Sequence, residues 1–148
     1  RANVAYFGTF GYELDLNKLS YEEISEVKQQ IAFMKEYREL IQFGTFYRLK
    51  SPFEGNETVW MTVSEDKKTA LVFWYRERNV VNADFTRVRL QGLDPDFIYR
   101  NEYNGTENYG DELMNLGLLT TDCTAGEPTS EDEPCTDYES RIYVLTAK

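Results

Sequence analysis

The sequence contains no histidine, although it is 148 residues long. Ser-His and Cys-His triads need an imidazole as general base, and the usual zinc sites use histidine or several cysteines as ligands. Both kinds of site are therefore excluded within this chain. Any chemistry in it would depend on carboxylates, tyrosine, lysine or a thiol without an imidazole partner.

Cysteine is scarce as well, since Cys123 and Cys135 are the only two in the chain. Both lie within residues 119–139, an acidic segment rich in Pro, Ser and Thr that we interpret as a loop insertion at the surface. Two cysteines are too few for a disulfide framework. A local disulfide and a pair of free thiols are both compatible with this spacing.

Excess positive charge and long apolar runs are also missing. The formal net charge is −10 at pH 7, whereas nucleic acids and anionic membranes are bound by clustered Lys and Arg. No apolar run approaches the roughly 20 residues of a membrane-spanning helix. We therefore expect neither a nucleic-acid nor a membrane partner. The chain shows no secretory signal and opens on Arg1, so we expect a cytoplasmic fragment of a longer protein.

Residues 1–44 predict one strand followed by one long helix. The apolar run at residues 2–8 is typical of a buried strand. Ser20 and Glu23 have the spacing of a capping box, and Gly44 is a common type of helix end. An apolar stripe at helical spacing lies between them: Ile24, Val27, Ile31, Met34, Tyr37, Leu40 and Ile41. The helix is therefore expected over about residues 20–43.

Residues 45–148 have the pattern of an all-β domain. Short runs rich in aromatic and β-branched residues alternate with turns at 46–50, 58–63, 69–75, 86–90, 97–100 and 141–145. Residues 58–75 have the form of a hairpin, because two such runs flank a short polar turn. Strands at this spacing are typical of an antiparallel β-sandwich. The predicted class is thus mainly β, with a strand–helix unit resembling the last βα unit of a (β/α)8 barrel at its start.

Three stretches resemble glycoside hydrolase family 36. These are residues 8–16 (Gly-Thr-Phe-Gly-Tyr-Glu-Leu-Asp-Leu), residues 46–54, and residues 92–95 followed by Tyr-Gly-Asp-Glu-Leu-Met-Asn at 109–115. The resemblance implies the end of a catalytic barrel over residues 1–44 and a C-terminal β-sandwich over 45–148. The acidic segment at 119–139 departs from the family pattern.

The resemblance implies an enzyme that cleaves terminal α-linked galactose with retention of configuration. Such a reaction uses two carboxylates about 5–5.5 Å apart. In this family both are aspartates on earlier barrel strands, so no residue of this chain is expected to be catalytic. We expect structural support of the barrel, no cofactor, no metal and a homo-oligomeric parent enzyme that acts on α-galactoside oligosaccharides. A carbohydrate-binding module and a galactosyl transferase of the same superfamily are the alternatives.

One loop of this chain is a candidate for substrate contact. Active sites of such barrels lie at the carboxyl ends of the strands, where the predicted last strand leads into residues 8–11. We therefore predict that Gly8, Thr9 and Phe10 bind substrate. In the alternative interpretation the glycines form a tight turn and Phe10 packs inside.

Several acidic residues have a structural and a functional interpretation. Asp94 and Asp96 suggest calcium, but the further oxygen ligands are missing, so an ordinary turn is expected. Asp111, beside Glu112, is expected to hold backbone donors. Glu13 and Asp15 are expected at the surface or the helix entry. The acidic residues Glu127, Glu131, Asp132, Glu133 and Asp137 are expected in a solvated loop.

Two tryptophans and two tripeptides complete the candidates. Exposed rings of Trp60 and Trp74 would favour a carbohydrate-binding module, but tryptophan in mid-strand is usually core. Residues 56–58 and 104–106 match the Asn-X-Thr pattern for N-glycosylation. That pattern is common and carries no weight here without a secretion signal.

Overall fold

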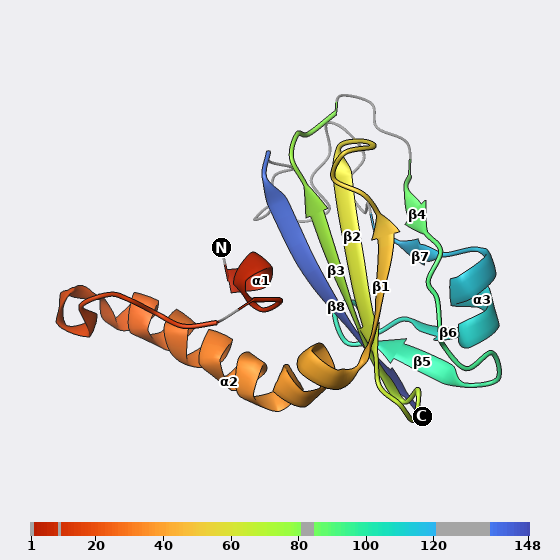
Figure 1. Ribbon diagram of the computed structural model, residues 1–148, viewed down its shortest axis with the longest axis horizontal. Helices are drawn as coiled ribbons and strands as arrows, with labels where there is room; N and C mark the ends of the chain where they lie inside the picture. Colours follow the sequence, from red (N-terminus) through yellow and green to blue (C-terminus); the bar gives the residue numbers. More distant parts are fainter. Residues whose placement is uncertain (1, 9, 81–84, 121–136) are drawn as a thin grey trace. The chain divides into compact units, whose positions relative to one another are not determined.

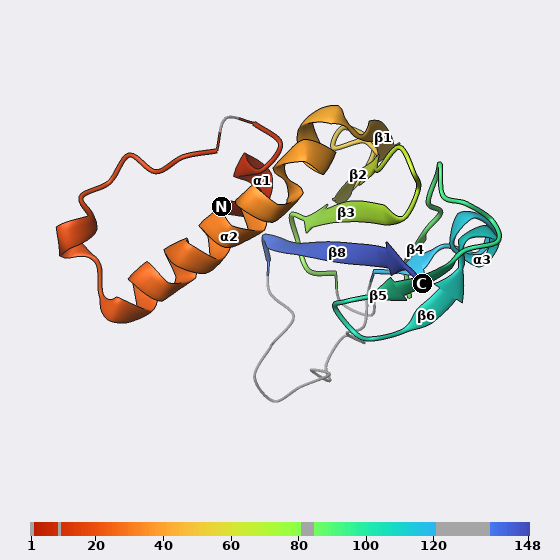
Figure 2. The ribbon, with the colours of Figure 1, turned by 90° about the horizontal axis from the view of Figure 1, so that it is seen from below.

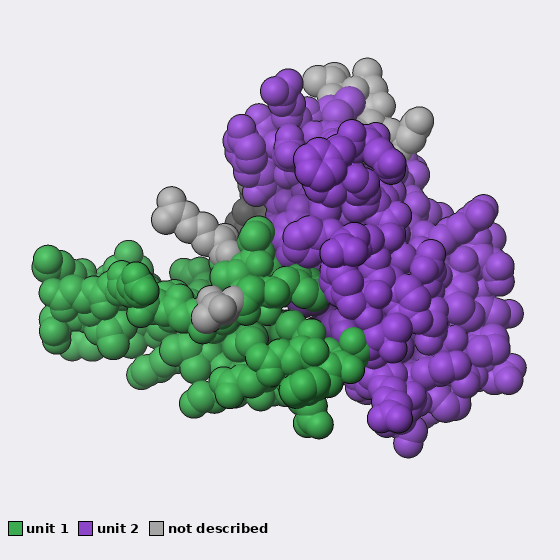
Figure 3. Space-filling view, viewed as in Figure 1, with its two compact units in different colours: residues 1–44 green, residues 45–148 purple. Residues whose placement is uncertain are grey.

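The computed structural model describes residues 2–8, 10–80, 85–120 and 137–148. The chain divides into two compact units, residues 1–44 and residues 45–148 (Figure 3). Cys123 and Cys135, most of the acidic segment and Thr9 lie outside the described residues. Within the described ranges, no helix combines the length and the apolar character needed to span a bilayer.

The first unit contains one long helix with the predicted boundaries. Helix α2 spans Tyr21–Phe43. The Ser20 hydroxyl accepts a hydrogen bond from the Glu23 backbone N–H, and the Glu23 carboxylate accepts one from the Ser20 N–H. At the other end, the Gly44 N–H donates to the Leu40 carbonyl. The capping box and the glycine stop are thus confirmed.

The structure differs from the strand predicted at residues 2–8. Ala2–Ala5 form one helical turn, α1, in which the Tyr6 N–H donates to the Ala2 carbonyl. A parallel strand obtains its hydrogen bonds from neighbouring strands, and the described part of this unit contains none. The backbone therefore forms local bonds instead, and a short apolar run does not distinguish the two outcomes. A short 3-10 turn, η1 (Leu16–Lys18), precedes α2.

The second unit is built on a six-stranded antiparallel sheet in the order β1-β2-β3-β8-β5-β6 (Figures 1 and 2). Its strands are β1 (Thr45–Lys50), β2 (Glu57–Val63), β3 (Thr69–Arg76), β5 (Ile98–Asn101), β6 (Glu107–Tyr109) and β8 (Glu139–Ala147). A second sheet pairs β4 (Arg87–Val88) with β7 (Leu118–Leu119), and helix α3 spans Gly110–Asn115. The mainly antiparallel β architecture predicted from the sequence is therefore confirmed.

The core of this unit lies between the large sheet and a thinner second layer. In Figure 1, β4, β7 and α3 lie together on one side of the large sheet. The sheet contributes buried Val59, Met61, Val72, Trp74, Tyr143 and Leu145, and the second layer contributes Val88, Leu90, Leu93, Leu113 and Leu118. Alternate residues of each strand point to one face, which explains how β2 and β3 fill this core.

Helix α3 and the short strands β6 and β7 were not predicted. Asp111, which the sequence predicts to hold backbone donors, lies with Glu112 in the first turn of α3. Only six residues are helical, which is too short for a helical period to show. The helix begins instead where the Gly110 N–H donates to the Phe97 carbonyl, a contact from another segment.

Candidate functional site

The loop that follows α1 is held by stacked aromatic rings. Phe10 stacks on Tyr6 with ring centroids 4.9 Å apart, and its ring meets Tyr12 edge-on at 5.4 Å. Tyr6 also packs against Phe33 of α2 at 4.9 Å. We call Tyr6, Phe10, Tyr12 and Phe33 the aromatic cluster. It holds the loop against the helix, and the half-buried Phe10 is part of this packing.

The phenols of this cluster are hydrogen-bond donors rather than bases. Burial raises the pKa of Tyr6 above its ordinary value, and the nearby Tyr12 raises it further. Burial also raises the pKa of Tyr12, with a smaller contribution from Glu26. The Tyr12 hydroxyl donates to the side-chain oxygen of Gln30. Both phenols therefore stay protonated at neutral pH and serve to position the loop.

A groove of about 1090 Å³ lies between the loop and α2. The loop side contains the predicted site residues Gly8 and Phe10, and the helix side contains much of the predicted apolar stripe. That side is formed by Ile24, Val27, Lys28, Ile31, Met34, Lys35, Arg38 and Gln42. Met34 is buried, while the other apolar members of this side are half-buried. The groove thus combines an apolar floor with three cationic side chains.

The glycines of the loop are not required by its backbone. A Cβ atom added to Gly8 would approach only the Ala5 carbonyl, at 3.7 Å, and one added to Gly11 would have no neighbour within 4 Å. Neither glycine has the positive φ that favours glycine over other residues. Gly8 still closes a turn, because its N–H donates to the Ala5 carbonyl at 3.0 Å. The space around both positions would also permit the close approach of another molecule or segment.

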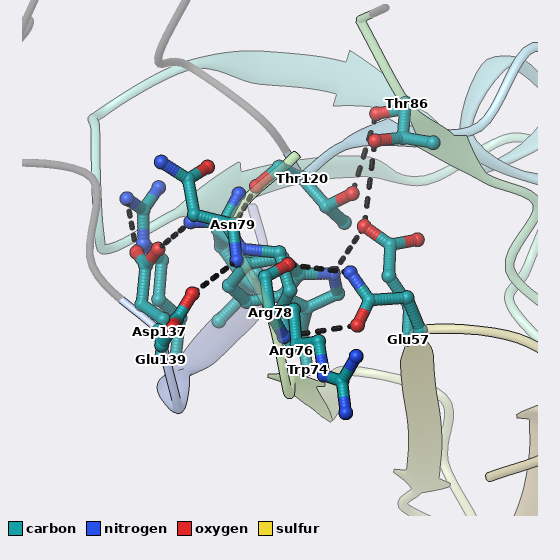
Figure 4. Close-up of polar contacts among 12 residues, drawn as sticks. Glu57, Trp74, Arg76, Arg78, Asn79, Thr86, Thr120, Asp137 and Glu139 are labelled. Atoms are coloured by element: carbon teal, nitrogen blue, oxygen red, sulfur yellow. Dashed lines mark hydrogen bonds and ion pairs between the residues drawn. The ribbon is translucent and has the colours of Figure 1, made fainter. Parts of the chain in front are cut away.

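A second cluster of polar groups lies at one end of the large sheet (Figure 4). The sheet register sets Glu57, Arg76 and Glu139 side by side on β2, β3 and β8. The Trp74 indole N–H donates to the Glu57 carboxylate at 3.1 Å, and Lys50 forms an ion pair with the same carboxylate. Sequence reasoning missed this cluster because its members lie far apart along the chain.

Glu139 binds two guanidinium groups at once in this cluster. Arg76 and Arg141 both form ion pairs with its carboxylate, and both side chains are almost fully buried. The two guanidinium groups also lie 5.2 and 5.7 Å from the Trp74 ring centroid, within the range of cation–π attraction. A cavity of about 540 Å³ adjoins the cluster at Lys50, Glu57 and Arg76. Glu57 and Glu139 each bind a side chain of a neighbouring strand, so these contacts join the strand ends.

The remaining candidates have structural roles. Trp74 is fully buried, and half-buried Trp60 packs edge-on against Phe46 and Tyr75, so neither tryptophan offers an open platform for a sugar ring. This weighs against a carbohydrate-binding module built on these two residues.

The acidic candidates bind backbone donors. Asp94 accepts a hydrogen bond from the Asp96 N–H, Asp111 from the Glu112 N–H, and Asp137 from the Asn79 N–H. Asp15 caps the 3-10 turn η1. Glu127, Glu131, Asp132 and Glu133 fall outside the described residues. In the part of the chain that the structure describes, no three acidic or sulfur-bearing side chains are grouped closely enough to hold a metal ion.

Comparisons with known proteins match both units. Residues 57–145 match the model of the glycosyl hydrolase family 36 C-terminal domain, and residues 1–44 match the melibiase model. Alpha-galactosidase AgaA of Geobacillus stearothermophilus is 52% identical over 118 residues, which is 80% of this chain and 16% of that protein.

Solved structures of AgaA variants are similar over almost the whole chain. The complex with raffinose has a TM-score of 0.85 at 43% identity, and the complex with stachyose has 0.84 at 44% identity. Each match covers 99% of this chain and 19% of the solved chain. The chain thus spans less than a fifth of the length of the relatives that it matches.

Proposed function

Because this chain belongs to glycoside hydrolase family 36, we propose that it is the C-terminal part of a retaining α-galactosidase. The observation that carries the proposal is the order of its two matches, melibiase over residues 1–44 and the family 36 C-terminal domain over residues 57–145. The first match supports placing residues 1–44 at the end of the catalytic barrel, and the second supports assigning the sheet unit to the domain that follows.

The catalytic aspartates belong, in this proposal, to barrel strands outside this chain. Retaining hydrolysis requires one carboxylate as nucleophile and a second as acid and base, about 5–5.5 Å apart. Glu57 is bound by Lys50 and Trp74, and Glu139 is bound by two arginines. These carboxylates are thereby committed to the sheet, which supports a non-catalytic role for the second unit. That role is structural support of the barrel.

The substrates of the parent enzyme are, in this proposal, α-galactoside oligosaccharides of the raffinose and stachyose type. Variants of a relative that matches 99% of this chain have been crystallised with these two sugars. A cytoplasmic location and a homo-oligomeric parent stay predictions. Cell fractionation and light scattering of the parent chain test them.

The loop containing Gly8, Thr9 and Phe10 contributes to substrate binding in this proposal through its backbone. The absence of a conformational reason for Gly8 and Gly11 supports close approach of the sugar to this loop. Phe10 contributes indirectly, because its stacking on Tyr6 holds the loop in place.

Incubation of the full-length parent with raffinose tests the proposed activity. A hydrolase releases free galactose in equal amount to sucrose. A galactosyl transferase moves galactose to a second sugar without releasing it, which would replace the hydrolase with the alternative from the same superfamily. No change in raffinose would contradict both.

Substitution of Gly11 by Ala tests the role of the loop. The added methyl group meets no atom of this unit, so the melting temperature should stay unchanged while kcat/KM for raffinose falls roughly tenfold, or about 1.4 kcal/mol. Gly55→Ala is the matched control, because it also has no neighbour within 4 Å and lies in the second unit. Equal kcat/KM for both variants would remove the loop from the binding site.

A further inference from the structure

Two tripeptides of the second unit share the Asn-X-Thr pattern but differ in their surroundings. Asn104, Gly105 and Thr106 form the exposed turn between β5 and β6. Asn56 immediately precedes β2, and Thr58 lies within that strand, paired with Tyr75 of β3. The sequence pattern alone treats the two asparagines as equivalent, whereas their hydrogen bonds separate them.

The side chain of Asn104 presents its amide nitrogen to solvent. Its Oδ1 atom accepts hydrogen bonds from the Thr106 backbone N–H at 3.1 Å and from the Thr106 hydroxyl at 2.7 Å. No hydrogen bond to a described residue involves its Nδ2 atom. The turn itself is held by backbone bonds from Asn101 to Thr106 and from Gly105 to Asn101. A substituent on Nδ2 therefore requires no change in the described contacts.

Both polar atoms of the Asn56 side-chain amide form hydrogen bonds. Its Nδ2 donates to the Arg78 carbonyl at 2.5 Å, and its Oδ1 accepts from the Arg78 N–H at 2.9 Å. Because both bonds go to the backbone of Arg78, that backbone lies beside the Oδ1 and Nδ2 atoms of the Asn56 side chain. A trans-substituted amide places its substituent on the same side as the carbonyl oxygen. A sugar on this nitrogen would therefore occupy the space of the Arg78 backbone.

We infer that Asn104 has the geometry of an acceptor for N-linked glycosylation when the chain enters a secretory pathway, and that Asn56 does not. The modification requires a lipid-linked oligosaccharide diphosphate as donor. Asn104 Nδ2 forms a bond to C1 of the first sugar, and the bond between C1 and the diphosphate oxygen breaks. The lipid diphosphate leaves with the electron pair, and the amide proton passes to a base of the transferase. The inference concerns acceptor geometry and does not rest on the proposed activity.

The position of Asn104 gives a glycan a physical role. The turn leads into β6, an edge strand of the large sheet, and the neighbouring Tyr103 and Tyr109 are both about half exposed. Exposed strand edges and aromatic rings favour association with other chains. A glycan at Asn104 would cover this edge.

Expression of the full parent chain behind a cleavable secretion leader in yeast tests the inference. Chymotrypsin cleaves after aromatic residues, so Asn56 and Asn104 fall on separate peptides, 54–60 and 104–109. Glycan release by an amidase in heavy-oxygen water marks each occupied asparagine by mass. Leader removal verifies entry into the secretory pathway. In folded, leader-free protein, we expect the mark on Asn104 and none on Asn56.

Three variants make the test independent of folding losses. Thr106→Ala should abolish the mark on Asn104, Thr106→Ser should retain it, and Thr58→Ala should leave it unchanged. An unmarked Asn104 in leader-free protein, or a marked Asn56 in the folded fraction, would overturn the inference.

Discussion

At the scale of single residues, the carboxylate of Glu139 forms ion pairs with two arginines that are almost fully buried. Arg76 and Arg141 have side chains 6% and 10% exposed, so water cannot solvate them if the carboxylate is lost. Their stacking on Trp74 depends on the same arrangement. Loss of the Glu139 carboxylate should therefore destabilise the chain more than loss of a carboxylate at the surface.

Replacement of Glu139 by Gln should destabilise the chain by about 2–3 kcal/mol, because it leaves two buried cations without a counter-charge. Urea unfolding measures this change in the free energy of unfolding. Glu107→Gln is the matched control, because its partner Lys148 is half exposed and the pair is solvent-screened. Equal small effects in both variants would contradict a stabilising role for the cluster.

Asp66 stabilises the turn between β2 and β3 in its charged form. Its carboxylate accepts hydrogen bonds from the Lys68 N–H and the Ser64 hydroxyl, which lower its pKa below the ordinary value of an aspartate. A carboxyl with a lowered folded pKa adds stability above its unfolded pKa and loses it as pH falls through the folded pKa.

Asp66→Asn should therefore melt at a lower temperature than the parent sequence at pH 7, and the difference should begin to shrink as the pH falls below about 4, towards the lowered folded pKa. Thermal melts between pH 7 and pH 3 measure it. Glu65→Gln in the same turn is the control. A difference in melting temperature that stays constant with pH would show that the charge of Asp66 does not contribute to stability.

At the scale of elements, the packing of α3 depends on a glycine. A Cβ atom at Gly110 would lie 1.9 Å from the Asp94 carbonyl oxygen, a backbone atom that cannot easily move. The Gly110 N–H also donates to the Phe97 carbonyl. The close approach of the two segments, rather than the backbone angle, explains glycine at this position.

Gly110→Ala should lower the free energy of unfolding by about 2–3 kcal/mol, since overpacking against backbone forces the segments apart. Gly55→Ala, with no neighbour within 4 Å, should change it by less than about 0.5 kcal/mol. Both values come from the same denaturant titration. A stable Gly110→Ala variant would show that the turn at residues 94–97 adapts freely.

The elements that the sequence predicted well are those with repeated local signals. Helix α2 combines a capping box with an apolar stripe, and the β2–β3 hairpin combines two strand patterns with a polar turn. Helix α3 has no such repeat, because its start is set by a bond to Phe97. The run at residues 2–8 is equally compatible with strand and helix, and the absence of a described partner strand decides between them.

At the scale of the whole molecule, the order of strands could not be predicted. Strand β8 lies between β3 and β5, so residues 139–147 pair with a strand that lies about 70 residues earlier in the chain. The same pairing creates the cluster of Glu57, Arg76 and Glu139, which no local spacing indicates. Family resemblance could predict the architecture because it carries the order of the elements, whereas periodicity carries only their type.

In the proposed function, catalysis belongs to the longer protein and structural support of the barrel to this chain. The most direct test is hydrolysis of a chromogenic α-galactoside by the full-length parent and by residues 1–148, at equal molar concentration. We expect turnover by the parent and none by residues 1–148. Turnover by residues 1–148 alone, or none by the parent, would contradict the account.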